Sequence, residues 1–126
     1  MATNEQFIND LIKKTTENKI QWTILQKASR NIIYAELENL LKSFDDYVEQ
    51  KSSYALSHKQ GIIIFLTLIN ANEQKWFSLI IKKDVRTDYI ILNTKKENQV
   101  ELFRLANIIT RQSSGIDEFM EDFMNS

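Results

Sequence analysis

Glu73, Gln74 and Lys75 are the residues whose spacing most resembles a catalytic motif. They form a Glu-x-Lys triplet, with which a large class of metal-dependent nucleases places a carboxylate beside a lysine. Such a Mg²⁺ site also requires a second acidic residue on the neighbouring strand. Residues 62–69, the expected neighbour, contain no acidic residue. The triplet alone therefore predicts no metal site, and residues of such common types recur by chance.

His58 is the single histidine of the chain. A zinc site needs three or four protein ligands, and an acid–base histidine needs a nucleophile or a carboxylate beside it, so His58 provides neither by itself. The chain has no cysteine and only two glycines, which excludes a thiolate site and leaves too little glycine for a phosphate-binding loop. We expect no cofactor and no metal, and catalysis is disfavoured but not excluded.

Basic residues surround the last two expected strands in two separate groups. One end of that hairpin carries Lys82, Lys83 and Arg86, the other end carries Lys75, Lys95 and Lys96, and Arg104 lies elsewhere. The formal net charge of the chain is −1, whereas tight nucleic-acid binding needs a strongly basic face. We therefore expect solvated edges and no nucleic-acid partner, with a modest anion-binding role as the alternative.

The last segment of the chain indicates a partner most clearly. Its apolar residues recur at the i, i+3, i+4, i+7, i+8 spacing of an amphipathic helix, and its polar face is acidic without a basic residue. We favour docking of the apolar face onto the protein's own sheet. The alternative is a helix that enters the groove of a partner through adaptable methionine contacts. The candidate partner-binding residues are Asp117, Glu118, Phe119, Met120, Glu121, Asp122 and Phe123.

Two helices are expected in the first half of the chain. The apolar spacing over residues 4–15 predicts the first, with a capping box formed by Thr3 and Gln6 and a stop at Asn18. Helical spacing from Asn31 to Gln50 predicts the second, although part of that segment would also suit a strand.

The second half is expected to carry two more helices. Thr94 and Glu97 form a capping box for a helix that reaches about Gln112. Ser113 to Gly115 would end it, and Ser114 with Asp117 would begin the last helix.

Between these helices the apolar residues alternate or run continuously, which predicts strands. The connections are too short for parallel crossovers, so the strands are expected to be antiparallel. The fold class is therefore α+β, an antiparallel sheet of four to five strands packed by N-terminal and C-terminal helices, mainly on one face. The length fits a single domain over residues 1–126. The expected strands cover residues 20–24, 53–58, 62–69, 76–81 and 89–92.

No membrane association is expected. The N-terminal residues lack the apolar core of a signal peptide. The longest apolar run, Ile62 to Ile69, is far shorter than the roughly 18 residues that a bilayer-spanning helix requires. These features favour a cytoplasmic protein.

Four short segments give the chain a resemblance to a known group. They are Lys19-Ile20-Gln21-Trp22, Ser53-Tyr54, and residues 101–107 ahead of 117–120. Their order is similar to that in small uncharacterised proteins of phages and mobile elements in low-GC Gram-positive bacteria. The resemblance implies no activity or site, and at most a small accessory protein that acts on a host factor.

The sequence thus predicts a non-enzymatic protein-interaction module, in the most specific form a phage or mobile-element protein that binds and inhibits a host defence factor. One alternative is a small metal-dependent nuclease or hydrolase that uses Glu73, Lys75 or His58. Another is a homodimeric regulatory protein, in which the last helix or an open sheet edge is self-complementary.

Overall fold

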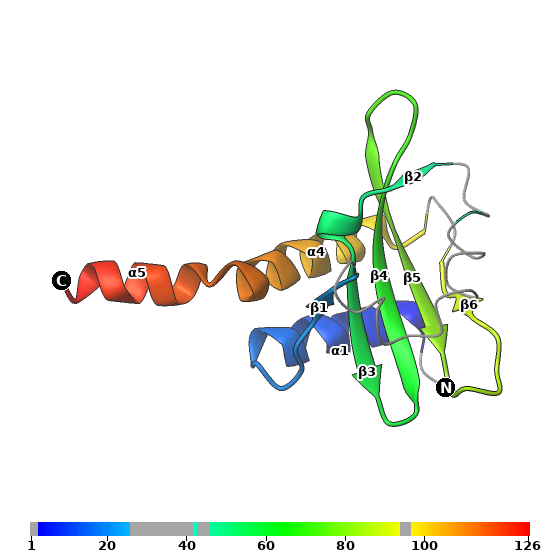
Figure 1. The fold of residues 1–126 in the computed structure, drawn as a ribbon, viewed down its shortest axis with the longest axis horizontal. Helices are drawn as coiled ribbons and strands as arrows, with labels where there is room; N and C mark the ends of the chain where they lie inside the picture. Colours follow the sequence, from blue (N-terminus) through cyan, green and yellow to red (C-terminus); the bar gives the residue numbers. More distant parts are fainter. Residues whose placement is uncertain (1–2, 26–41, 43–45, 94–96) are drawn as a thin grey trace.

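A computed structural model describes residues 3–25, 42, 46–93 and 97–126 (Figure 1). Within these residues an antiparallel sheet of six strands packs against two helices, and a third helix extends away from the sheet. This confirms the predicted α+β class. The five predicted strands are all present, two of them (β1 and β6) shortened to two residues, and β2 is a sixth strand that was not predicted. The elements are α1 (Asn4–Thr16), β1 (Thr23–Ile24), β2 (Tyr47–Val48), the 3-10 helix η1 (Gln50–Ser52), β3 (Tyr54–His58), β4 (Gly61–Ile69), β5 (Lys75–Lys82), β6 (Ile90–Ile91), α4 (Gln99–Ser114) and α5 (Ile116–Met124).

The strands follow the order β1-β3-β4-β5-β6, and β2 pairs with the end of β4 that β3 leaves open. In the β3–β4 hairpin His58 lies opposite Gly61, so the turn contains only two residues. Lys59 in this turn has a φ of 54°, in the left-handed region that such tight turns use. A Cβ on Gly61 would lie 2.4 Å from the backbone oxygens of Lys82 and Lys83. Only glycine therefore fits at the start of β4.

β4 is the central strand and is buried on both faces. Ile63 and Phe65 belong to the core on the helix side, whereas Ile64 and Leu66 belong to a second core on the other face. None of the four is more than 9% exposed. The near-continuous apolar run of this segment predicted a strand covered on both sides, and the structure confirms it.

α1 and α4 cover one face of the sheet. α1 contributes Ile8 and Leu11 and α4 contributes Leu102, Leu105 and Ile109, all at most 5% exposed and packed with the helix-side residues of β3, β4 and β5. These positions follow helical spacing, so each helix buries one stripe of side chains.

The predicted capping box of α1 is also confirmed. The Thr3 hydroxyl accepts the Gln6 backbone N–H at 3.1 Å, and the Gln6 side chain accepts the Thr3 N–H at 2.9 Å.

The helix predicted from Asn31 to Gln50 lies mostly outside the described residues. At its end the prediction is wrong, because Tyr47 and Val48 form β2 and Gln50 begins η1. Tyr47 and Val48 pair with the end of β4, where they satisfy backbone groups that the short β3 does not reach.

The predicted starts of both C-terminal helices are wrong as well. α4 begins at Gln99 rather than near Thr94, which lies outside the described residues. The side-chain oxygen of Gln99 accepts a hydrogen bond from the Phe77 N–H, and the side-chain amide of Gln99 donates one to the Phe77 carbonyl, both at 2.9 Å. These two bonds fix where α4 can start. The Ser114 hydroxyl bonds the Arg111 carbonyl instead of capping α5. α4 runs to Ser114, two residues beyond the predicted end near Gln112, and Gly115, the last residue of the predicted stop, is its C-cap.

Candidate functional site

α5 continues from α4 past one residue in the left-handed conformation. Gly115 has φ 67° and ends α4, and α5 starts at the next residue. The Arg111 guanidinium bonds the Asp117 carboxylate across this junction at 2.7 and 2.8 Å. The hydrogen bond with Asp117, together with its negative charge, raises the pKa of Arg111. The pair is solvent-exposed, so it orients α5 on α4 but contributes little to stability.

The apolar face of α5 is open to solvent. Figure 1 shows α5 running on from α4 away from the sheet, with the C-terminus far from the N-terminus. The favoured prediction that this helix docks onto the sheet is therefore wrong. The exposed fractions of its apolar residues are 40% for Ile116, 67% for Phe119, 42% for Met120, 73% for Phe123 and 79% for Met124.

The other face of α5 is acidic. Asp117, Glu118, Glu121 and Asp122 are all exposed, and residues 116–126 contain no basic residue. These four residues contribute −4, while the whole chain carries −1, so residues 1–115 carry a formal net charge of +3. The projecting helix and the rest of the chain thus have opposite charge.

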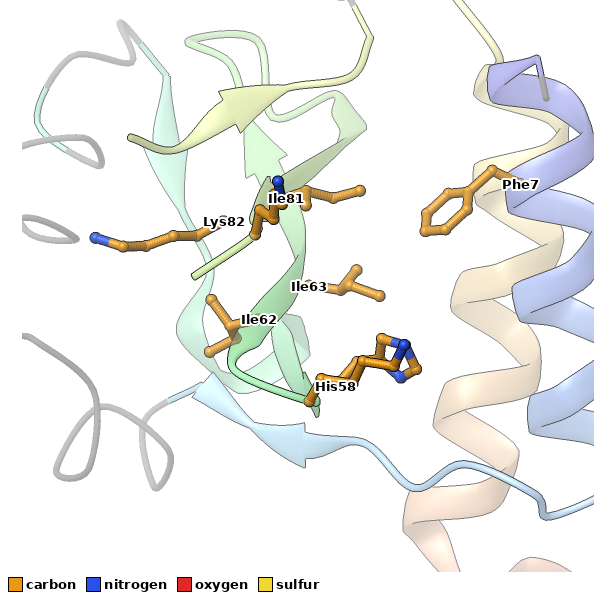
Figure 2. A pocket seen from close by; sticks show the side chains of 9 residues that line it. Phe7, His58, Ile62, Ile63, Ile81 and Lys82 are labelled. Atoms are coloured by element: carbon orange, nitrogen blue, oxygen red, sulfur yellow. The ribbon is translucent and has the colours of Figure 1, made fainter. Parts of the chain in front are cut away.

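A groove of about 320 Å³ lies between α1 and the turn ends of β3, β4 and β5. Figure 2 shows Ile63 and Ile81 pointing from the sheet toward Phe7 on α1, with His58 pointing the same way. The side chains of Ile62 and Lys82 point to the opposite side of the sheet. The groove therefore has apolar walls near the N-terminal end of α1.

Lysines lie at the mouth of this groove. Lys59 in the β3–β4 turn and Lys83 just after β5 are both exposed and line it, together with the exposed His58. None of the described residues that line the groove carries a carboxylate. We call this site, defined by Phe7, His58, Lys59, Ile63, Ile81 and Lys83, the basic groove.

The candidate catalytic residues do not meet. His58 is the last residue of β3, just before the hairpin turn that leads into β4, and Glu73 lies in the turn after β4 with φ 62°. The eight residue steps of β4 separate these turns by about 26 Å. Lys75 contacts the Glu49 carboxylate at 3.4 Å. Among the described residues, no three His, Cys, Asp or Glu side chains are placed to hold a metal ion.

One predicted solvated lysine is buried. Lys82 is 5% exposed, and its ammonium lies 4.9 Å from the centre of the Tyr89 ring. Lys82 follows Ile81 on β5 and so points to the face opposite the helices, where burial and a cation–π contact replace the expected hydration. Lys83 and Arg86 are exposed as expected, whereas Lys95 and Lys96 lie outside the described residues.

The basic groove was missed at the level of sequence. Its strand residues His58, Ile63 and Ile81 share one face because of the two-residue period of each strand and the register that joins them, and Lys83 directly follows β5. The alternation was visible, but the register and the position of Phe7 depend on contacts between distant segments.

Comparisons of the chain with models of protein families, with curated proteins and with solved structures found no match. Of the helices in the described part of the chain, none combines the length and the apolar character that crossing a membrane requires.

Proposed function

We propose that this chain is a non-enzymatic protein-interaction module and that α5 is the element that binds the partner. One observation carries the proposal. All five large apolar side chains of α5 are at least 40% exposed. Among the described elements, α5 contacts mainly α4, from which it runs on away from the sheet. Contiguous exposed apolar surface on a soluble protein marks an interaction site more often than it serves the fold.

The physics of short helices supports this assignment. α5 has nine residues, and isolated helices shorter than about 12–15 residues are marginally stable in water. Docking into a groove would stabilise α5 and bury its apolar face at the same time. Phe119 and Phe123 lie one turn apart on that face, which suits two aromatic anchors, while Met120 and Met124 can adapt to an irregular surface.

The resemblance to small proteins of phages and mobile elements supports a more specific form of the proposal. In that form the chain is a cytoplasmic accessory protein that binds and inhibits a host defence factor. The separation of His58 from Glu73 gives the nuclease alternative no geometric support.

The test compares the full chain with a Phe119→Ala, Phe123→Ala variant as baits in cells of the source organism. A matched control is Val85→Ala with Val100→Ala, which removes two side chains that are 68% and 73% exposed outside α5. We expect a partner that the chain and the control retain and the α5 variant loses. Both variants should unfold cooperatively, as followed by circular dichroism in urea. Retention of every partner by a folded α5 variant would refute the role of α5.

A further inference from the structure

We propose that α5 binds the basic groove of a second copy of this chain, and that two chains exchange their α5 helices reciprocally to form a closed dimer. This inference rests on the proposed function, because it names the partner of the same helix. It joins two features at opposite ends of the molecule, the exposed acidic helix and an unfilled apolar groove flanked by lysines.

Charge complementarity selects this occupant. α5 carries four carboxylates and no cation, whereas residues 1–115 carry a net charge of +3. Lys59 and Lys83 at the mouth of the groove would face Glu118 and Asp122, and no described lining residue would oppose those carboxylates. A direct pairing of two α5 helices would instead bring two sets of four carboxylates together, which costs energy through like-charge repulsion.

The apolar surfaces match in size and kind. A groove of about 320 Å³ lies at the small end of ligand pockets, so it can accept anchor side chains but not a whole helix. Phe119 and Phe123 are the two aromatic residues of α5, and both side chains are exposed on one face of the helix. They would pack against Phe7, Ile63 and Ile81, which form the walls of the groove.

A chain cannot fill its own groove in this arrangement. The groove lies near the N-terminal end of α1, and α5 runs away from the sheet toward the opposite end of the molecule (Figure 1). The contact is therefore between chains. Reciprocal exchange uses both helices and both grooves and closes the assembly, whereas one-way docking would continue into an open chain of subunits.

The first experiment measures the mass of the purified full chain by light scattering and sedimentation equilibrium across a wide range of concentration. We expect a dimer of about 30 kDa, twice the chain mass of 14.9 kDa. Phe119→Ala with Phe123→Ala, and separately Lys59→Glu with Lys83→Glu, should each weaken dimerisation at least about tenfold. Lys51→Glu with Arg104→Glu makes the same charge change away from the groove and should leave the dimer intact.

The second experiment exchanges the charges between two chains. A Glu118→Lys, Asp122→Lys variant has lysines at the two helix positions that face the groove, and its groove is also basic. The Lys59→Glu, Lys83→Glu variant has an acidic helix and an acidic groove. Each should be monomeric alone, because helix and groove repel. Mixed together they should form a one-to-one heterodimer, since each helix then meets a groove of opposite charge.

The outcomes separate this inference from the proposed function. A chain that stays monomeric at all concentrations overturns the self-exchange but leaves α5 free to bind a different protein, which the bait experiment reads independently. A dimer that the groove or α5 substitutions leave unchanged, or a charge-exchanged pair that does not associate, also overturns it. In the bait experiment, retention of every partner by the folded Phe119→Ala, Phe123→Ala variant would refute the proposed function instead.

Discussion

The indole N–H of Trp22 donates a hydrogen bond to the hydroxyl of Thr15 at 3.0 Å, and both side chains are buried. The Thr15 hydroxyl in turn donates to the Leu11 carbonyl at 2.6 Å, within α1. Trp22 precedes β1, and its backbone N–H donates to the Gln112 side chain on α4 at 3.2 Å. This one residue therefore joins the edge of the sheet to both helices that cover it.

Thr15→Val should destabilise the protein by about 1–3 kcal/mol, because it keeps the shape of the side chain but leaves the buried Trp22 indole without its acceptor. Urea unfolding followed by tryptophan fluorescence measures the change. Thr16→Val is the matched control, since Thr16 also donates to the carbonyl four residues back, at 2.8 Å, but is exposed. A Thr15 variant no less stable than the control would show that this bond is not important to the fold.

The features of the fold that local interactions determine can be predicted from the sequence. The Thr3–Gln6 capping box needs only residues within one turn of helix, and it forms as predicted. The central strand β4 was recognisable because a strand buried on both faces lacks polar positions.

The predictions are wrong where contacts between distant segments determine the structure. Tyr47 and Val48 suit a helix by spacing, but they pair with β4 because β3 is too short to cover that strand's far end. The amphipathic pattern of α5 is the same for a helix that packs on its own sheet and for one that faces a partner. Only the path of α4 and the junction at Gly115 decide between them.

The two glycines should tolerate alanine very differently. Gly61→Ala should cost about 3 kcal/mol, because its Cβ would lie 2.4 Å from two backbone oxygens that cannot move away without breaking the β4–β5 pairing. Gly115→Ala should cost about 1–2 kcal/mol, which is the price of the left-handed conformation alone, since the nearest atom to its Cβ would be 3.6 Å away. Chemical denaturation of both variants checks the order; equal losses would contradict it.

Glu49 should make stability depend on pH in the acid range. Its carboxylate accepts a hydrogen bond from Ser52, which together with Lys75 holds the pKa of Glu49 below its ordinary value of 4.5. A carboxyl group whose pKa is lowered in the folded state contributes stability above its unfolded pKa. That contribution is lost as the pH falls through the lower, folded pKa.

Ser52→Ala should therefore raise the pKa of Glu49 toward 4.5 and destabilise the protein at neutral pH, and the difference from the native chain should shrink in acid. Urea unfolding across the range from neutral to acid pH measures this. A Ser52 variant with a constant deficit at every pH would indicate a lost packing contact and not a shifted titration.

The side chain of Asn93 makes hydrogen bonds with the backbone of β5 that a neighbouring strand would otherwise make. Its side-chain oxygen accepts the Leu79 N–H at 2.8 Å and its amide donates to the Phe77 carbonyl at 3.1 Å, and the side chain is 5% exposed. β6 has only two residues, so this amide and that of Gln99 satisfy backbone groups of β5 that no strand reaches.

Asn93→Ala should thus destabilise the protein by about 2 kcal/mol or more, because it leaves the buried Leu79 N–H without an acceptor. The Phe77 carbonyl would keep its bond from Gln99, so Asn93→Ala combined with Gln99→Ala should cost more than the sum of the two single changes. Asn107→Ala, an exposed change on α4, should alter the free energy of unfolding by less than about 0.5 kcal/mol. Hydrogen exchange of the Leu79 amide measures the same loss locally. An amide still protected in the Asn93 variant would mean that water or another group replaces the bond.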